Sequence, residues 1–156
     1  MKKSFFLLVI LPLLSFGQLK KEVLFIGNSY TYYNNLPDLV NEIALSFGDT
    51  LMHESSTPGG SNFNAHSTNA QTLNKINQKQ WDYVVLQAQS QELSFSPFQV
   101  ANDSYPYAEI LVDSIFANSS CTEPLFFMTW GRKYGDQSNC QFYPPVCTYL
   151  GMQQRL

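Results

Sequence analysis

The chain has 156 residues, of which 44% are hydrophobic and 15% aromatic, enough for the core of one domain and too many for a disordered protein. Its formal net charge is −3 and it contains no run of basic residues, which excludes nucleic acid as an expected partner. We find no internal repeat and no linker, and we expect a single domain.

The first 17 residues have the pattern of a secretory signal peptide. Lys2 and Lys3 form a basic start, residues 5–14 are apolar, and Ser15 and Gly17 supply small residues before Gln18. The apolar run is short for a bilayer, so a retained membrane anchor is the weaker alternative. We expect export to the periplasm or the extracellular space, with no stable membrane span once the signal is removed.

A buried strand followed by a tight turn is predicted at residues 23–31. The apolar run Val23–Ile26 ends at Gly27, which allows a sharp bend, and Asn28 and Ser29 follow. A strand, a turn and a helix in this order can lift a serine nucleophile to the carboxyl edge of a parallel sheet. For an isolated serine, a helix cap or turn is the ordinary interpretation.

Helices and strands are predicted to alternate along the rest of the chain. A helix with one buried face is expected over residues 36–47, with Leu36, Leu39, Val40, Ile43, Ala44 and Phe47 on that face. The other expected elements are a weak strand at 50–54, a helix capped by Ser61 or Asn62 and ending near 80, a strand at 83–86 buried on both faces, a helix at 99–117, a strand at 124–130 and a helix from Thr148. This order predicts a three-layer α/β/α sandwich around a flavodoxin-like parallel sheet.

Three loops that follow predicted strands carry the residues suited to acyl transfer. The first holds Ser29, the second Gly59 and Gly60, and the third is the polar segment 87–92. A serine hydrolase needs a hydroxyl nucleophile and hydrogen-bond donors aimed at the developing oxyanion. A glycine backbone N–H and a side-chain amide are such donors, and the three loops should open at one edge of the sheet.

In this ordered set of motifs, the chain resembles the SGNH (GDSL-like) hydrolase superfamily. Residues 23–31 resemble its first sequence block, with Gly-Asn-Ser in place of the commoner Gly-Asp-Ser. Residues 57–61 (Thr-Pro-Gly-Gly-Ser) resemble the second block, and residues 81–91 occupy the place of the third. The Leu-Gln-x-Gln-Ser sequence at 86–90 is similar to that of a bacterial, often exported subgroup.

The resemblance implies a role for each matching residue. Ser29 would be the nucleophile, and its backbone N–H would bind the oxyanion together with Gly60 and the amide of Gln91, or alternatively that of Gln89. Gln91 stands where the superfamily has asparagine, which keeps the amide and adds a methylene. Asn28, Gly59 and Arg132 are candidates for lining the substrate cleft, with solvated loop charges as the alternative for Arg132 and Lys133.

The fourth block of the superfamily, Asp-x-x-His, does not occur in the sequence. The two histidines, His53 and His66, lie upstream of the third block, and we interpret both as structural. Asp38, Asp82 and Asp103 are interpreted as caps or surface acids. We therefore expect residues 18–156 to be a partial domain without the last strand and helix, truncated before the catalytic aspartate and histidine.

Three cysteines remain after the signal peptide. Cys140 and Cys147 enclose a proline-stiffened loop, and in an oxidising compartment we expect them to form a disulfide. Zinc is the weaker alternative because no histidine lies nearby. Cys121 would be left over and buried. No metal or cofactor is expected.

The expected function is hydrolysis of acyl or acetyl esters through an acyl-enzyme on Ser29. The substrate would be a small-molecule or glycan ester, with decorated carbohydrate as a candidate. Because serine is a poor nucleophile without a general base, we expect little turnover from this chain alone. The alternative is a non-catalytic relative that binds a carbohydrate or an ester in the same cleft.

Overall fold

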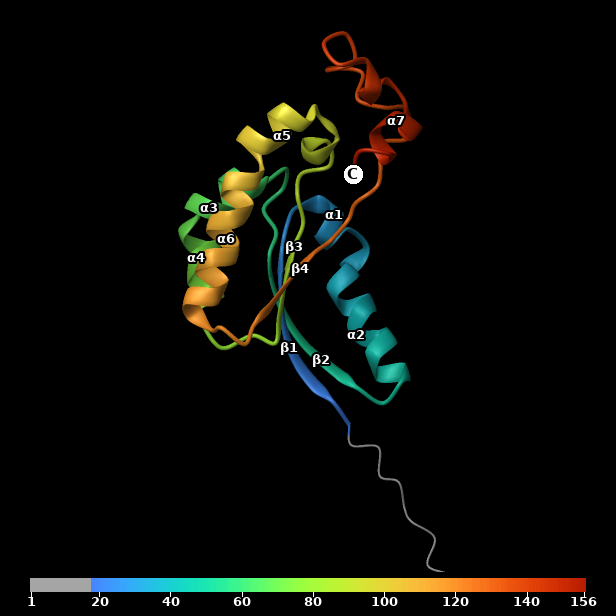
Figure 1. Cartoon of the computed structure of the whole chain (residues 1–156). Helices are drawn as coiled ribbons and strands as arrows, with labels where there is room; N and C mark the ends of the chain where they lie inside the picture. Colours follow the sequence, from blue (N-terminus) through green and yellow to red (C-terminus); the bar gives the residue numbers. More distant parts are fainter. Residues whose placement is uncertain (1–17) are drawn as a thin grey trace, which may run out of the picture.

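The computed structural model describes residues 18–156, and the predicted signal peptide at 1–17 lies outside the described residues. Four parallel strands form one sheet in the order β2-β1-β3-β4 (Figure 1). The strands are β1 (Lys20–Ile26), β2 (Thr50–Ser56), β3 (Tyr83–Leu86) and β4 (Glu123–Phe126). This order equals the first four positions of a flavodoxin-like sheet, as the alternating pattern predicts.

Helices cover both faces of the sheet, which confirms the predicted three-layer α/β/α architecture. Figure 1 shows α2 (Leu36–Ser46) on one face and the other long helices on the opposite face. The helices of that second layer are α3 (Phe63–Thr68), α4 (Ala70–Asn77) and α6 (Tyr105–Asn118), with α5 (Pro97–Asp103) near its upper end.

The main core lies between the sheet and the layer formed by α3, α4 and α6. On β1 and β3, alternate residues point into it, because successive side chains of a strand face opposite ways. The buried residues of this cluster are Leu24, Ile26, Phe63, Ile76, Trp81, Val84, Leu86, Ala88, Ala108, Leu111 and Ile115. On β3, Tyr83 and Val85 are only half-buried, so the prediction that this strand is buried on both faces was wrong for the second face.

Helix α2 differs from its prediction in how much of its apolar stripe is covered. Leu36, Val40 and Ala44 are half-buried toward the sheet. The neighbouring stripe of Leu39, Ile43 and Phe47 is exposed, with Phe47 81% exposed. The apolar stripe is wider than the contact that one helix makes with a sheet, and no described element lies over the rest of it.

Two predicted helices are each divided in the structure. Asn69 leaves the helical conformation (ψ 114°) and its Oδ1 accepts hydrogen bonds from the backbone N–H groups of Gln71 and Thr72, which begins α4. The second division is at Ser104, just before Pro106. At Asn69 the side chain competes with a continuous helix by bonding to the backbone, whereas at Ser104 the division is set by Pro106, which has no N–H to donate to the preceding turn.

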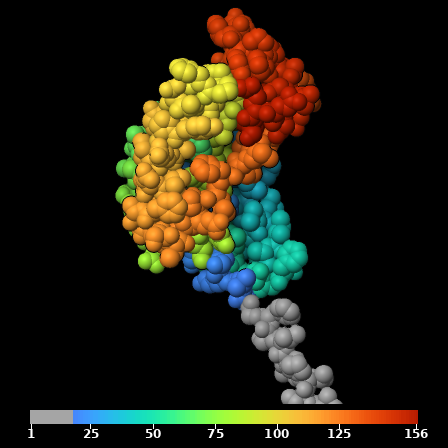
Figure 2. Space-filling model, viewed as in Figure 1, coloured from blue at the N-terminus to red at the C-terminus, as the bar shows by residue number. Residues whose placement is uncertain are grey.

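Short elements and loops gather at the carboxyl end of the sheet. They are α1 (Ser29–Tyr32), η1 (Tyr33–Asn35), η2 (Glu92–Ser94), η3 (Pro144–Cys147) and α7 (Tyr149–Gln153). Figure 2 shows the C-terminal segment, in red, at this end of the molecule beside the segment coloured yellow. A hydrogen bond from Arg155 Nε to the backbone oxygen of Phe95 (3.2 Å) joins the two segments.

Candidate active site

Three loops meet at the carboxyl edge of the sheet, and Asn28 joins them. Its backbone N–H, directly after β1, donates to Oε1 of Gln87, directly after β3, at 2.9 Å. Its side-chain Nδ2 donates to the backbone oxygen of Ser61, on the loop after β2, at 2.7 Å. The prediction that the three loops open at one edge is confirmed.

Ser29 begins the short helix α1, at the point where the buried strand β1 turns back. Asn28 is the cap of this helix, and its Oδ1 accepts a hydrogen bond from the backbone N–H of Tyr30 at 3.1 Å. Because both ends of the Asn28 amide are engaged and the residue is only 2% exposed, it positions the turn. Ser29 itself is half-buried.

Gly27 fits this turn because there is no room for a side chain. A Cβ at this position would lie 2.5 Å from Oγ1 of Thr31 and 2.6 Å from Oε1 of Gln87. The same Gln87 oxygen accepts a hydrogen bond from the Thr31 hydroxyl at 2.9 Å. The turn is therefore packed directly against a fully buried glutamine, whose importance the sequence analysis missed. The feature of the sequence that could have indicated its burial is its position directly after the apolar strand Tyr83–Leu86.

Ser29 lines a surface pocket of about 430 Å³ with aromatic walls. Tyr30 and Trp130 form one side, with their ring centroids 4.7 Å apart. Tyr32, Tyr33 and Asn34 complete the lining. The predicted nucleophile therefore lies beside a surface suited to a ring or an apolar group.

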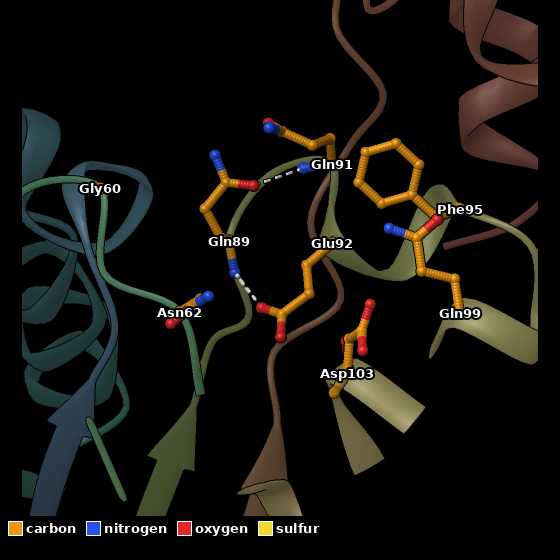
Figure 3. Close-up of a pocket in the computed structure, with 9 residues that line it drawn as sticks. Gly60, Asn62, Gln89, Gln91, Glu92, Phe95, Gln99 and Asp103 are labelled. Atoms are coloured by element: carbon orange, nitrogen blue, oxygen red, sulfur yellow. Dashed lines mark hydrogen bonds between the residues drawn. The ribbon is translucent and has the colours of Figure 1, made fainter. Parts of the chain in front are cut away.

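The other predicted oxyanion residues line a different pocket, of about 390 Å³ (Figure 3). Gly60 comes from the loop after β2, and Gln89 and Gln91 come from the loop after β3. The remaining lining residues are Asn62, Glu92, Phe95, Gln99, Asp103 and Ser104. The structure brings Gly60, Gln89 and Gln91 together, whereas Ser29 lines the aromatic pocket. Gly59 is exposed on the same loop as Gly60.

Both glutamine amides have their oxygen engaged by the protein. Oε1 of Gln89 accepts a hydrogen bond from the backbone N–H of Gln91 at 2.9 Å (dashed in Figure 3). Oε1 of Gln91 accepts from the Arg132 guanidinium and, at 3.3 Å, from the Ser90 hydroxyl. Each amide therefore keeps its nitrogen, the donor end, for the pocket.

Glu92 is one of two carboxyl groups that line this pocket, the other being Asp103. Its Oε2 accepts a hydrogen bond from the backbone N–H of Gln89 at 3.1 Å. Its Oε1 and the nearby Ser104 hydroxyl are buried, and neither completes a hydrogen bond within residues 18–156. Burial raises the pKa of Glu92, against the opposing effect of the Gln89 N–H.

We expect Glu92→Gln to raise the melting temperature at about pH 8, and the gain to shrink toward about pH 4. The raised pKa means that Glu92 favours folding only while it is protonated, and this contribution is lost as the pH rises through the folded-state pKa. Glutamine stays neutral, so it avoids that loss. Thermal melts of both proteins across this range measure the effect, with the exposed Glu109→Gln as the control. An equal gain in melting temperature at both pH values would contradict the raised pKa of Glu92.

His66 is fully buried and engaged at both ring nitrogens. Nε2 lies 2.8 Å from the backbone oxygen of Gly27, and Nδ1 lies 2.9 Å from Oγ1 of Thr72. Because a carbonyl can only accept, Nε2 carries the proton and Nδ1 accepts from Thr72. Burial lowers the pKa of His66 and keeps it neutral. Its role is to hold the end of β1.

His53 lies away from the turn, on β2, where its Nε2 is 3.0 Å from Oδ1 of the exposed Asp38. Asp38, interpreted from the sequence as a cap or surface acid, therefore has a histidine partner. Asp82 accepts hydrogen bonds from Lys21 and from the backbone of Glu22. Neither histidine contacts Ser29 among the interactions of residues 18–156.

The expected disulfide between Cys140 and Cys147 is present. Cys121 is exposed, so the prediction that it is buried was wrong: it lies on the turn before β4, outside the core. Residues 18–156 contain no group of three or more metal-ligating side chains and no helix that is both long and apolar enough to cross a membrane.

No model of a known protein family matches the chain, and no curated protein matches it in sequence. Its fold is similar to the crystal structure of a DUF4886 family protein from Bacteroides uniformis, with a TM-score of 0.67 and 18% identity. The match covers 85% of this chain and 58% of that protein, so the chain spans a little over half of its neighbour's length. At this identity, the similarity establishes the α/β fold alone.

Proposed function

We propose that residues 18–156 carry the nucleophile and the oxyanion donors of a serine ester hydrolase. The observation that carries the proposal is the hydrogen bonding of Asn28, which fixes the Ser29 turn against the loops of Gly60 and of Gln87–Gln91. Acyl transfer needs a nucleophile beside oxyanion donors, so the proposal requires an ester that reaches from the pocket lined by Ser29 to the pocket lined by Gly60, Gln89 and Gln91.

In the proposed reaction, Oγ of Ser29 attacks the ester carbonyl carbon while a base takes its proton. The tetrahedral oxyanion is bound by the backbone N–H groups of Ser29 and Gly60 and by the Gln91 amide, with Gln89 as the alternative. The C–O bond to the alcohol then breaks, the alcohol leaves with a proton, and the acyl group remains on Ser29. Water hydrolyses this ester in a second step.

The base is not one of the two histidines of this chain, because His66 is buried with both nitrogens engaged and His53 lies on β2 beside Val23, away from the Ser29 turn. We therefore expect slow acylation and still slower deacylation by residues 18–156. Added imidazole can replace a missing base in the acylation step. The acetyl-enzyme should then accumulate.

The test is to incubate residues 18–156 with p-nitrophenyl acetate and increasing imidazole, and to locate acetyl groups by peptide mass mapping. We expect acetylation of Ser29 that rises with imidazole. Ser29→Ala is the activity control, and Ser46→Ala, at an exposed serine of α2, is the matched control that should retain acetylation. If Ser29 is acetylated no faster than Ser46, the chain is not an esterase.

A second candidate is a non-catalytic protein that binds a carbohydrate or an ester. It is favoured by the engagement of both histidines and by the amide and carboxyl lining of the pocket beside Gly60. Such a protein would bind its ligand equally well with Ser29→Ala and would show no acetylation of Ser29. The same experiment therefore separates the two functions.

We also propose that the chain is exported. The pattern of residues 1–17 and the Cys140–Cys147 disulfide support this, because disulfides persist in oxidising compartments.

A further inference from the structure

Arg132, on the loop after β4, reaches across to the loop after β3. Its Nε and Nη2 lie 3.3 and 3.1 Å from Oγ of Ser90, and Nη2 also donates to Oε1 of Gln91. The Ser90 hydroxyl in turn donates to the same Gln91 oxygen at 3.3 Å. Two donors therefore converge on one end of the Gln91 amide.

The other side of the guanidinium is anchored to Asp136. Nη1 of Arg132 lies 3.4 Å from Oδ1 of Asp136, a carboxylate that is only 1% exposed. Oδ2 of Asp136 accepts a hydrogen bond from Nδ2 of Asn139 at 2.6 Å. The backbone N–H of Asp136 donates to the oxygen of Val146 at 2.7 Å, within the loop that the disulfide closes. Arg132 is thus held between a rigid loop and Gln91.

This arrangement decides which end of the Gln91 amide faces the pocket. A guanidinium has donors and no acceptor, so only the carbonyl end of Gln91 can face Arg132. The Nε2 group is left for the pocket that Gln91 lines together with Gly60. Accepting from a charged donor also polarises the amide, which strengthens its N–H groups as donors.

We infer that Arg132 is a positioning residue that orients and polarises the Gln91 amide, so that Nε2 is the donor presented to the pocket. Asp136 holds Arg132 in place and is itself hydrogen-bonded to Val146 of the disulfide-closed loop, so Arg132 acts without contacting the ligand. The orientation stands on the geometry alone, and its effect on acyl transfer rests on the proposed function.

The orientation is tested by the side-chain amide signal of Gln91 in a ¹H–¹⁵N NMR spectrum, assigned from its absence in Gln91→Ala. We expect Arg132→Ala to shift this signal toward that of an exposed glutamine, and Arg132→Lys, which keeps a cationic donor, to shift it less. Lys133→Ala is the matched control, because Lys133 is exposed and lies over the ring of Tyr134. A Gln91 signal that Arg132→Ala and Arg132→Lys leave in place would overturn the inference.

The effect on chemistry is tested by a double-mutant cycle on imidazole-dependent acetylation of Ser29. We expect Gln91→Ala to slow acetylation by about 10²-fold and Arg132→Ala by roughly tenfold. In the Gln91→Ala background, Arg132→Ala should have no further effect. An equal slowing in both backgrounds would show that Arg132 does not act through Gln91. If Ser29 of the parent is not acetylated at all, the proposed function fails, and the NMR result alone decides the inference.

Discussion

Replacing Gln87 by leucine is expected to lower the free energy of unfolding by about 2–5 kcal/mol. Oε1 of Gln87 is the acceptor for both the Asn28 backbone N–H and the Thr31 hydroxyl, and all three residues are buried. Leucine has a similar volume, so the substitution leaves two buried donors without an acceptor and little cavity. Urea denaturation of residues 18–156 measures the loss.

The matched control for this prediction is Gln89→Leu, two residues along the same loop. Gln89 is half-buried and its Oε1 accepts one hydrogen bond, from the backbone N–H of Gln91, so we expect a smaller loss of about 1 kcal/mol. If the two substitutions cost the same, Gln87 is not what holds the turn. Acetylation of Ser29 should also fall in Gln87→Leu, because the turn loses its support.

Replacing His66 by phenylalanine is expected to lower the free energy of unfolding by about 2–4 kcal/mol at neutral pH. Phenylalanine keeps a ring but removes the donor to the Gly27 oxygen and the acceptor for the Thr72 hydroxyl. The Thr72 hydroxyl still has Ser56 as a partner, at 2.9 Å, whereas the Gly27 carbonyl loses its side-chain donor.

The difference in the free energy of unfolding between the parent and His66→Phe should shrink as the pH falls. Because the folded-state pKa of His66 is lowered, its contribution is complete above the ordinary histidine value of about 6.5 and is lost as the pH drops below that value. His53→Phe, at the other histidine, is the control, and we expect it to change the free energy of unfolding little. A cost for His66→Phe that is the same at about pH 5 and about pH 8 would contradict this account.

Much of the fold follows from local patterns that the sequence shows directly. The apolar runs at Val23–Ile26 and at Tyr83–Leu86 predict the central strands, and their polar exits predict which loops meet. The disulfide follows from two cysteines separated by a short proline-containing loop. The position of Ser29 at the strand-to-helix turn is likewise a local consequence of Gly27.

What could not be predicted depends on contacts between distant segments. The two groups that donate to Oε1 of Gln87 lie 56 and 59 residues away, and Gln91 and Ser90 lie 41 and 42 residues from Arg132. A local sequence pattern counts a glutamine as a polar, exposed residue. Gln87 is buried because distant groups need a hydrogen-bond acceptor, which a local pattern does not show. The exposed stripe of α2 could not be predicted either, because periodicity shows that a face is apolar and not what covers it.

The exposed thiol of Cys121 has a practical consequence. It precedes β4, at the amino end of the parallel sheet, whereas the pockets beside Ser29 and Gly60 open at the carboxyl end. Since the other two cysteines are joined to each other, a maleimide dye would attach here alone. The protein can thus be immobilised or labelled with a fluorescent dye through the Cys121 thiol, while the loops of the candidate site still face the solution.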